Sequence, residues 1–209
     1  VHRFKPLTSV AEKANIDLPD QYIFCLSRID ANKGHDLLLY TFDIVRKGIP
    51  DIHLIIGGGS PKPQQTEQEV LTTMRKIIDE KDMHDRVNIV GYVPDEKLVA
   101  FYQWAQLFVL PSIFEPFGMT ALEAMACTVP VVASKFGGIR NVITSGENGL
   151  LVDPAHKGEF AEAMMRFLKD RNMAARLGQK GCATIQKQYS WEAIAEKHIS
   201  FYKKFIVRR

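Results

Sequence analysis

The fold follows from residues 107–126, which read LFVLPSIFEPFGMTALEAMA. The apolar run 107–110 predicts a short buried strand, and the stretch from Met119 onward is rich in residues that favour a helix. Pro116 and Gly118 lie between the two and require a turn. A strand, a tight turn and a helix expose free backbone N–H groups at the helix start, where the helix dipole attracts anions. This stretch therefore predicts a phosphate-binding turn.

Two carboxylates flank the turn, Glu115 before it and Glu123 eight residues later. Carboxylates accept hydrogen bonds from hydroxyl groups, so the pair would suit a ligand with a charged middle and hydroxylated ends. A nucleotide-sugar has this form. The alternative interpretation is that Glu115 only favours the helix start and that Glu123 is a solvated surface residue.

Strands and helices alternate along the rest of the chain. The predicted strands are residues 22–27, 52–56, 87–90, 107–110, 129–133 and 149–152. The predicted helices are residues 33–47, 66–82, 95–103 with Asp95 as cap, 119–127, 157–168, 173–187 and 191–205. This alternation predicts an α/β fold with a Rossmann-like, doubly wound parallel sheet of about six strands. Ligands of such sheets bind beyond the carboxyl ends of the strands.

The loops after the predicted strands are therefore the candidate site. Arg28 and Lys33 follow the first strand, and two fixed cations there could bind a diphosphate. The alternative is a solvated loop whose charges neutralise their neighbours. The glycine run 57–59 follows the second strand, but Lys62 stands where a dinucleotide fingerprint requires its third glycine, so we expect only a tight turn.

The stretch from Glu115 to Glu123, with its Glu-Pro-Phe-Gly-Met-Thr-Ala-Leu-Glu sequence, resembles the signature of retaining glycosyltransferases of family 4, the group 1 glycosyltransferases. The paired glycines 137 and 138 resemble a second family motif, although Asn141 stands where that motif commonly has Glu. Such enzymes have the GT-B architecture, in which two Rossmann-like domains face each other. The resemblance implies that residues 1–209 are the C-terminal, donor-binding half, with the last helix (about 191–207) packing on an absent N-terminal acceptor domain. We therefore expect a fragment that is inactive by itself.

The resemblance also implies residue roles. The catalytic group would be Arg28, Lys33 and Glu115, of which the two cations hold the diphosphate and Glu115 the sugar. Family members are described as transferring the sugar by same-face attack, so Glu115 is not expected to be a nucleophile. Donor binding would involve Glu123 at the ribose, the backbone of Phe117, Gly118, Met119 and Thr120 at the phosphates, and Gly91, Tyr92 and Val93 at the base. Tyr92 could equally be a packing residue.

Within the family the motifs are most similar to those of sucrose-phosphate and mannosylfructose-phosphate synthases. This similarity implies a UDP- or GDP-linked donor and fructose 6-phosphate as acceptor, while lipid and polysaccharide acceptors stay open. Two alternatives come from other classes. One is a different enzyme on this fold, such as a nucleotide-sugar epimerase or a phosphorylase, and the other is a non-catalytic module that binds a nucleotide-sugar.

Composition excludes several other functions. The chain has 209 residues, 46% hydrophobic, and a net charge of +3, which gives no indication of nucleic-acid binding and leaves peripheral membrane contact open. No apolar run approaches the roughly 20 residues of a transmembrane helix. Three widely spaced cysteines indicate free thiols in a reducing, cytoplasmic environment. The sequence has no Asp-x-Asp pair and no metal-ligand spacing among its six histidines, so we expect no cofactor and no metal requirement for donor binding.

Overall fold

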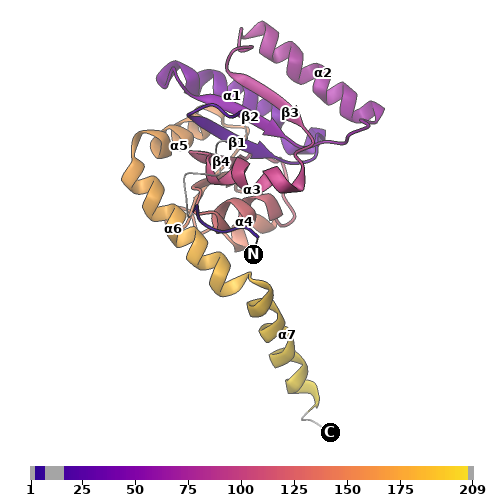
Figure 1. The fold of residues 1–209 in the computed structure, drawn as a ribbon, viewed down its shortest axis with the longest axis vertical. Coiled ribbons are helices and arrows are strands. Elements are labelled where there is room, and N and C mark those ends of the chain that lie inside the picture. The colour runs from indigo at the N-terminus through magenta and orange to yellow at the C-terminus, as the bar shows by residue number, and fades with distance from the viewer. Residues whose placement is uncertain (1–2, 8–16, 207–209) are drawn as a thin grey trace.

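The computed structural model describes residues 3–7 and 17–206, which form one parallel six-stranded sheet with helices on both faces (Figure 1). The strands are β1 (Tyr22–Leu26), β2 (His53–Gly57), β3 (Val87–Gly91), β4 (Leu107–Leu110), β5 (Val131–Ser134) and β6 (Leu150–Val152). The helices are α1 (His35–Gly48), α2 (Gln65–Glu80), α3 (Asp95–Gln103), α4 (Met119–Ala126), α5 (Lys157–Lys169), α6 (Arg171–Gln188) and α7 (Trp191–Ile206), with 3-10 turns η2 (Ala31–Lys33) and η3 (Gly138–Asn141). The predicted α/β fold and the number of strands are confirmed.

Side chains alternate between the two faces of the sheet, as a parallel sheet covered on both sides requires. In β1, Ile23 and Cys25 belong to the core under α1, α2 and α5, whereas Tyr22 and Phe24 belong to the core under α3 and α4. All four side chains are fully buried. The apolar runs of β1, β2, β4 and β5 are therefore buried on both faces, whereas the edge strand β3 exposes one of its faces.

The strand order β3-β2-β1-β4-β5-β6 places β1 and β4 side by side at the centre of the sheet. The chain moves outward to β3 on one side of this pair and to β6 on the other. The loops that follow β1 and β4 therefore leave the same edge of the sheet at the point where the strand order reverses. In open α/β sheets this is the place where a crevice forms.

Several predicted boundaries differ from the structure by one or two residues, and two of these differences have a clear local cause. The first helix was expected from residue 33, but the 3-10 turn η2 comes first and α1 begins only at His35, after Gly34 in the left-handed region (φ 65°). Asp95 does not cap α3, because Pro94 occupies the capping position and Asp95 is the first helical residue. The Asp95 carboxylate instead lies 3.1 Å from Arg3.

The last helix, α7, projects away from the rest of the domain (Figure 1). None of its residues is buried, and its aromatic side chains include Trp191, Phe201 and Phe205, each more than half exposed. Position 207, the expected end of this helix, lies outside the described residues. Within residues 3–7 and 17–206, no helix combines the length and apolar character that a bilayer span requires.

Candidate functional site

The loops after β1 and β4 contact each other directly. In the first loop, the Asp30 side chain accepts a hydrogen bond from the Asn32 amide (2.9 Å) and so starts the 3-10 turn that ends at Lys33. The carbonyl of Asn32 in turn accepts from the amide of Ile113 in the second loop (2.8 Å). The sequence-distant segments 27–34 and 111–118 therefore form one continuous wall at the switch point.

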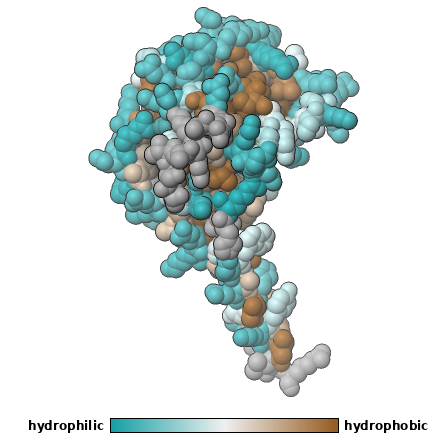
Figure 2. All heavy atoms as spheres, in the orientation of Figure 1, coloured by the Kyte–Doolittle hydropathy of each residue, from teal (hydrophilic) through white to brown (hydrophobic). Residues whose placement is uncertain are grey.

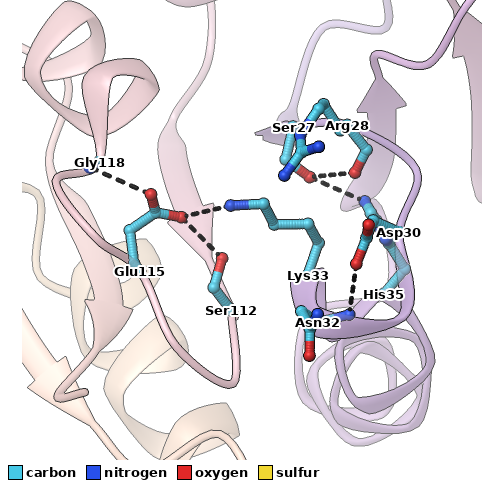
Figure 3. A network of polar contacts seen from close by, with 9 residues as sticks. All are labelled: Ser27, Arg28, Asp30, Asn32, Lys33, His35, Ser112, Glu115 and Gly118. Atoms are coloured by element: carbon cyan, nitrogen blue, oxygen red, sulfur yellow. Dashed lines mark hydrogen bonds and ion pairs between the residues drawn. The ribbon is translucent and has the colours of Figure 1, made fainter. Parts of the chain in front are cut away.

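The centre of this wall is an ion pair between Lys33 and Glu115 (Figure 3). Lys33 Nζ lies 2.8 Å from Glu115 Oε2, and the two side chains are only 12% and 10% exposed. The Ser112 hydroxyl donates to the same carboxylate oxygen (3.0 Å), and the Gly118 amide donates to the other (3.1 Å). Three donors thus satisfy the buried carboxylate, which is the condition for keeping a charge away from water.

Arg28 differs from Lys33 because its side chain is exposed. Among the described residues, no carboxylate lies within salt-bridge distance of its guanidinium. Arg28 therefore adds an uncompensated positive charge beside the neutralised Lys33–Glu115 pair.

The start of α4 lies next to Glu115, as the sequence predicts. Gly118 caps the helix in the left-handed conformation (φ 86°), and its amide already serves Glu115. The amides of Met119 and Thr120 have no acceptor one turn earlier within the helix. Their N–H groups, at the positive end of the helix dipole, can therefore donate to an anion. Phe117 and Met119 present exposed side chains (41% and 55%) at this helix start.

The paired glycines 137 and 138 hold the backbone of Glu115. The Glu115 amide donates to the Phe136 carbonyl (3.2 Å), and its carbonyl accepts from Gly138 (2.8 Å). A Cβ atom at Gly137 would lie 2.1 Å from the Glu115 carbonyl oxygen, and one at Gly138 would lie 2.0 Å from that of Pro116. Only glycines allow this approach, so the motif positions Glu115 through the main chain.

Glu123 is not a solvated surface residue. Its carboxylate accepts a hydrogen bond from the buried hydroxyl of Tyr102 on α3 (2.7 Å). Burial raises the pKa of the Glu123 carboxyl, and the Tyr102 hydrogen bond and the charge of Arg3 oppose this rise only in part. Glu123 also borders a cavity of about 270 Å³ that Phe117 and Met119 line.

The predicted base-binding residues lie just before α3, the helix that carries Tyr102. Gly91 ends β3 with φ 68°, and its carbonyl accepts from the Gly58 amide (2.7 Å). Tyr92 is 54% exposed, so it is not a core residue, whereas Val93 is buried and offers a ligand only its main chain. The glycine run 57–59 is not one tight turn: Gly57 ends β2, and Gly58 and Gly59 follow it with positive φ.

Sequence reasoning missed four side chains of the site. Ser112 lies two residues after the predicted strand 107–110, and Ser27 is the last residue of the predicted strand 22–27, so both positions carried a signal. His35 lies two residues after Lys33 in the sequence, and the structure buries it against Ser27. Tyr102 carried no signal, because its partner is decided by how α3 packs on α4.

Metal ligation was not expected from the sequence. In the part of the chain that the structure describes, no group of three or more His, Cys, Asp or Glu side chains is placed to hold a metal ion. On the loops after β1 and β4, the positive groups are Arg28, Lys33 and the N-terminus of α4.

The burial of the Glu123 carboxyl can be tested by comparing how the stabilities of the wild type and a Glu123→Gln variant depend on pH. Because its pKa is raised in the folded chain, ionisation opposes folding, so wild-type stability should fall relative to the variant as the pH rises from about 4 through the folded pKa. Urea denaturation of both proteins between pH 4 and pH 7 measures this difference. The exposed Glu147, changed to Gln, serves as control. A wild type that gained stability over the variant across this range would contradict the assignment.

The chain is similar to known proteins in sequence and in fold. The family model described as "Glycosyl transferases group 1" matches residues 8–184. Mannosylfructose-phosphate synthase of Agrobacterium fabrum is 32% identical over 201 residues, which are 94% of this chain and 44% of that protein.

Two solved structures extend the similarity to the fold. Sucrose-phosphate synthase from Thermosynechococcus elongatus has a TM-score of 0.85 at 32% identity and covers 100% of this chain, which matches 51% of that one. Anabaena HepE, solved in complex with UDP-glucose, has a TM-score of 0.83 at 22% identity over 97% of this chain and 55% of its own. The chain thus spans about half the length of the relatives that it matches.

Proposed function

Because the chain belongs to the group 1 glycosyltransferase family, we propose that it binds the nucleotide-sugar donor for a retaining glycosyl transfer. The observation that carries this proposal is the buried Lys33–Glu115 pair at the switch point, with the exposed cation Arg28 on the same loop. A carboxylate meets sugar hydroxyls and a cation meets phosphate oxygens, so adjacent opposite charges suit the junction between sugar and diphosphate.

The proposed chemistry follows from these charges. The bond between the anomeric carbon and the diphosphate oxygen breaks, and its electron pair leaves with the diphosphate. Arg28, Lys33 and the amides of Met119 and Thr120 stabilise the negative charge that develops there. The acceptor hydroxyl attacks the same face of the sugar that the diphosphate leaves, and its proton passes to the departing diphosphate oxygen. This gives retention without a covalent enzyme intermediate.

In this scheme Lys33 donates to the diphosphate and also to Glu115, the carboxylate that binds the sugar. Its ammonium group has three N–H donors, of which one is directed at Glu115. The remaining donors are available to phosphate oxygens, while the Glu115 carboxylate can accept from the sugar. The ion pair also reduces the repulsion that a bare carboxylate would exert on a diphosphate.

Glu123 and the 91–93 loop would bind the nucleoside. Tyr102 engages Oε2 of Glu123, which leaves Oε1 for a ribose hydroxyl. The exposed ring of Tyr92 and the main chain of Gly91 and Val93 would contact the base. The complex of HepE with UDP-glucose supports a UDP-linked donor, and a GDP-linked donor is the alternative to be tested.

The exposed helix α7 supports a second domain as partner. Figure 2 shows hydrophobic side chains along this helix, beyond the body of the domain. We propose that they pack on an N-terminal acceptor-binding domain, without which the donor half does not turn over. The relatives named as mannosylfructose-phosphate and sucrose-phosphate synthases support a sugar phosphate as acceptor.

The three buried, unpaired cysteines support a cytoplasmic location. Donor binding is proposed to need no metal.

Calorimetric titration tests the proposal most directly. The chain is titrated with UDP, GDP and ADP, and then with the glucose and mannose conjugates of the nucleotide that binds. Saturable binding of one of them supports a donor site and identifies its base. If none binds, the same titration of a two-domain protein decides between a site that needs its partner and a wrong proposal.

Arg28→Ala separates diphosphate binding from folding. Arg28 is exposed, so we expect its loss to change the free energy of unfolding by less than about 0.5 kcal/mol. Affinity for the diphosphate should fall roughly 10- to 100-fold, whereas that for the monophosphate changes less. Arg176→Ala, which removes another exposed arginine on α6, is the matched control. Equal losses for mono- and diphosphate would contradict the role of Arg28.

A further inference from the structure

His35 and Ser27 join the two ends of the loop that carries both cations. Ser27 immediately precedes Arg28, and His35 follows Lys33 by two residues. The Nε2 atom of His35 lies 3.0 Å from the Ser27 hydroxyl oxygen, and this hydroxyl also bonds to the Arg28 carbonyl (3.0 Å) (Figure 3). The contact therefore closes a loop of residues 27–35 at its base.

The buried His35 ring stabilises the folded state less than an apolar side chain would at this position. It is 1% exposed, and its Nδ1 atom has no hydrogen-bond partner among the described residues. A buried nitrogen without a partner destabilises the folded state, so an apolar side chain would serve packing better. What an apolar side chain lacks is the bond from Nε2 to Ser27.

The ring is neutral at physiological pH. Burial lowers the pKa of the imidazole to about 4, and the nearby charges of Asp36, Lys33 and Asp30 change this less. A neutral ring carries one proton on either nitrogen. If Ser27 donates to the Arg28 carbonyl, Nε2 carries the proton and donates to the Ser27 oxygen.

The position of Arg28 depends on its backbone. The other links in the loop lie on either side of it: the Ser27 amide bonds to Gly57 (3.3 Å), and the turn from Asp30 to Lys33 bonds within itself and to Ile113. The Arg28 side chain is exposed, and no carboxylate of residues 3–7 or 17–206 pairs with it. Its carbonyl, hydrogen-bonded to the Ser27 hydroxyl, is thus one local restraint on where the guanidinium points, and the buried Ile29 is another.

We propose that His35 is a positioning residue: through Ser27 it holds loop 27–33 in the conformation that presents Arg28 and Lys33 to the donor's diphosphate. This inference rests on the proposed function, because it assumes that the two cations bind the diphosphate. His35 itself does not contact the ligand.

The test compares Ser27→Ala, His35→Leu and His35→Gln with the wild type by two readouts. The first is hydrogen exchange of the amides of residues 28–34 without ligand, with the amides of β1 as internal reference. The second is calorimetric titration with UDP and GDP. Ser27→Ala removes only a hydroxyl, so it keeps the proposal testable if the His35 variants fold poorly.

Ser27→Ala and His35→Leu should speed exchange in the loop, but not in β1, and should weaken diphosphate binding about 3- to 10-fold. His35→Gln, whose Nε2 can reach the Ser27 hydroxyl, should show the loop exchange rates and the diphosphate affinity of the wild type. The double variant Ser27→Ala/His35→Leu should lose no more affinity than the worse single variant, because both remove the same bond.

Three results would overturn the inference. These are unchanged loop exchange in Ser27→Ala, a His35→Gln variant that behaves like His35→Leu, and additive losses in the double variant. If the loop exchanges faster as expected but the wild type binds no nucleoside diphosphate, even within a two-domain protein, the restraint is real and the proposed function is what fails.

Discussion

Lys33→Met is expected to weaken binding of the nucleoside diphosphate roughly 10- to 100-fold, because it removes a charged donor from the phosphate site. The change should also lower the free energy of unfolding by about 1–3 kcal/mol. Glu115 would then lose the cation 2.8 Å from its carboxylate while remaining buried, with only Ser112 and the Gly118 amide as donors. Titration calorimetry and urea denaturation measure the two effects.

A double variant separates these two roles of Lys33. Adding Glu115→Gln to Lys33→Met removes the unpaired buried charge, so stability should recover in part while diphosphate affinity stays low. Lys97→Met, which removes an exposed lysine on α3, is the matched control for overall charge. Recovery of affinity in the double variant would mean that Lys33 acts only by neutralising Glu115.

Gly34→Ala is expected to destabilise the protein by roughly 2–5 kcal/mol. Gly34 links η2 to α1 in the left-handed region (φ 65°), where an alanine is strained. A Cβ atom there would also lie 2.3 Å from the carbonyl oxygen of Pro111, on the loop after β4. The substitution therefore forces apart the two loops that bring Lys33 and Glu115 together, and diphosphate binding should fall with stability.

Two other glycines provide controls that isolate each part of this effect. Gly146 also has a positive φ (85°), but a Cβ atom there would meet nothing within 4 Å, so Gly146→Ala should cost only about 1–2 kcal/mol of strain. Gly158 lies in α5 with neither constraint, and Gly158→Ala should be neutral or stabilising by up to about 1 kcal/mol. A Gly34→Ala variant no less stable than Gly146→Ala would show that the loops are not in close contact.

The sequence by itself determined the elements of the fold. Apolar runs such as 107–110 and helical spacing such as that of 157–168 are local patterns, and the order of strands and helices follows from them. The rule that ligands bind beyond the carboxyl ends of parallel strands then placed Arg28, Lys33 and Glu115 at one edge of the sheet. The ends of elements were less certain, because Gly34 and Pro94 set them through backbone conformation.

Only the tertiary structure decided which side chains meet. Lys33 and Glu115 are 82 residues apart, and they pair because the strand order places β1 beside β4. Glu123 has Tyr102 as its partner because α3 packs on α4. His35 is buried against Ser27 because the loop after β1 folds back so that the first residue of α1 lies next to the end of the strand. Periodicity reports only which face of a strand or helix is apolar. Contacts between distant residues depend on the order and packing of those elements, which no local pattern contains.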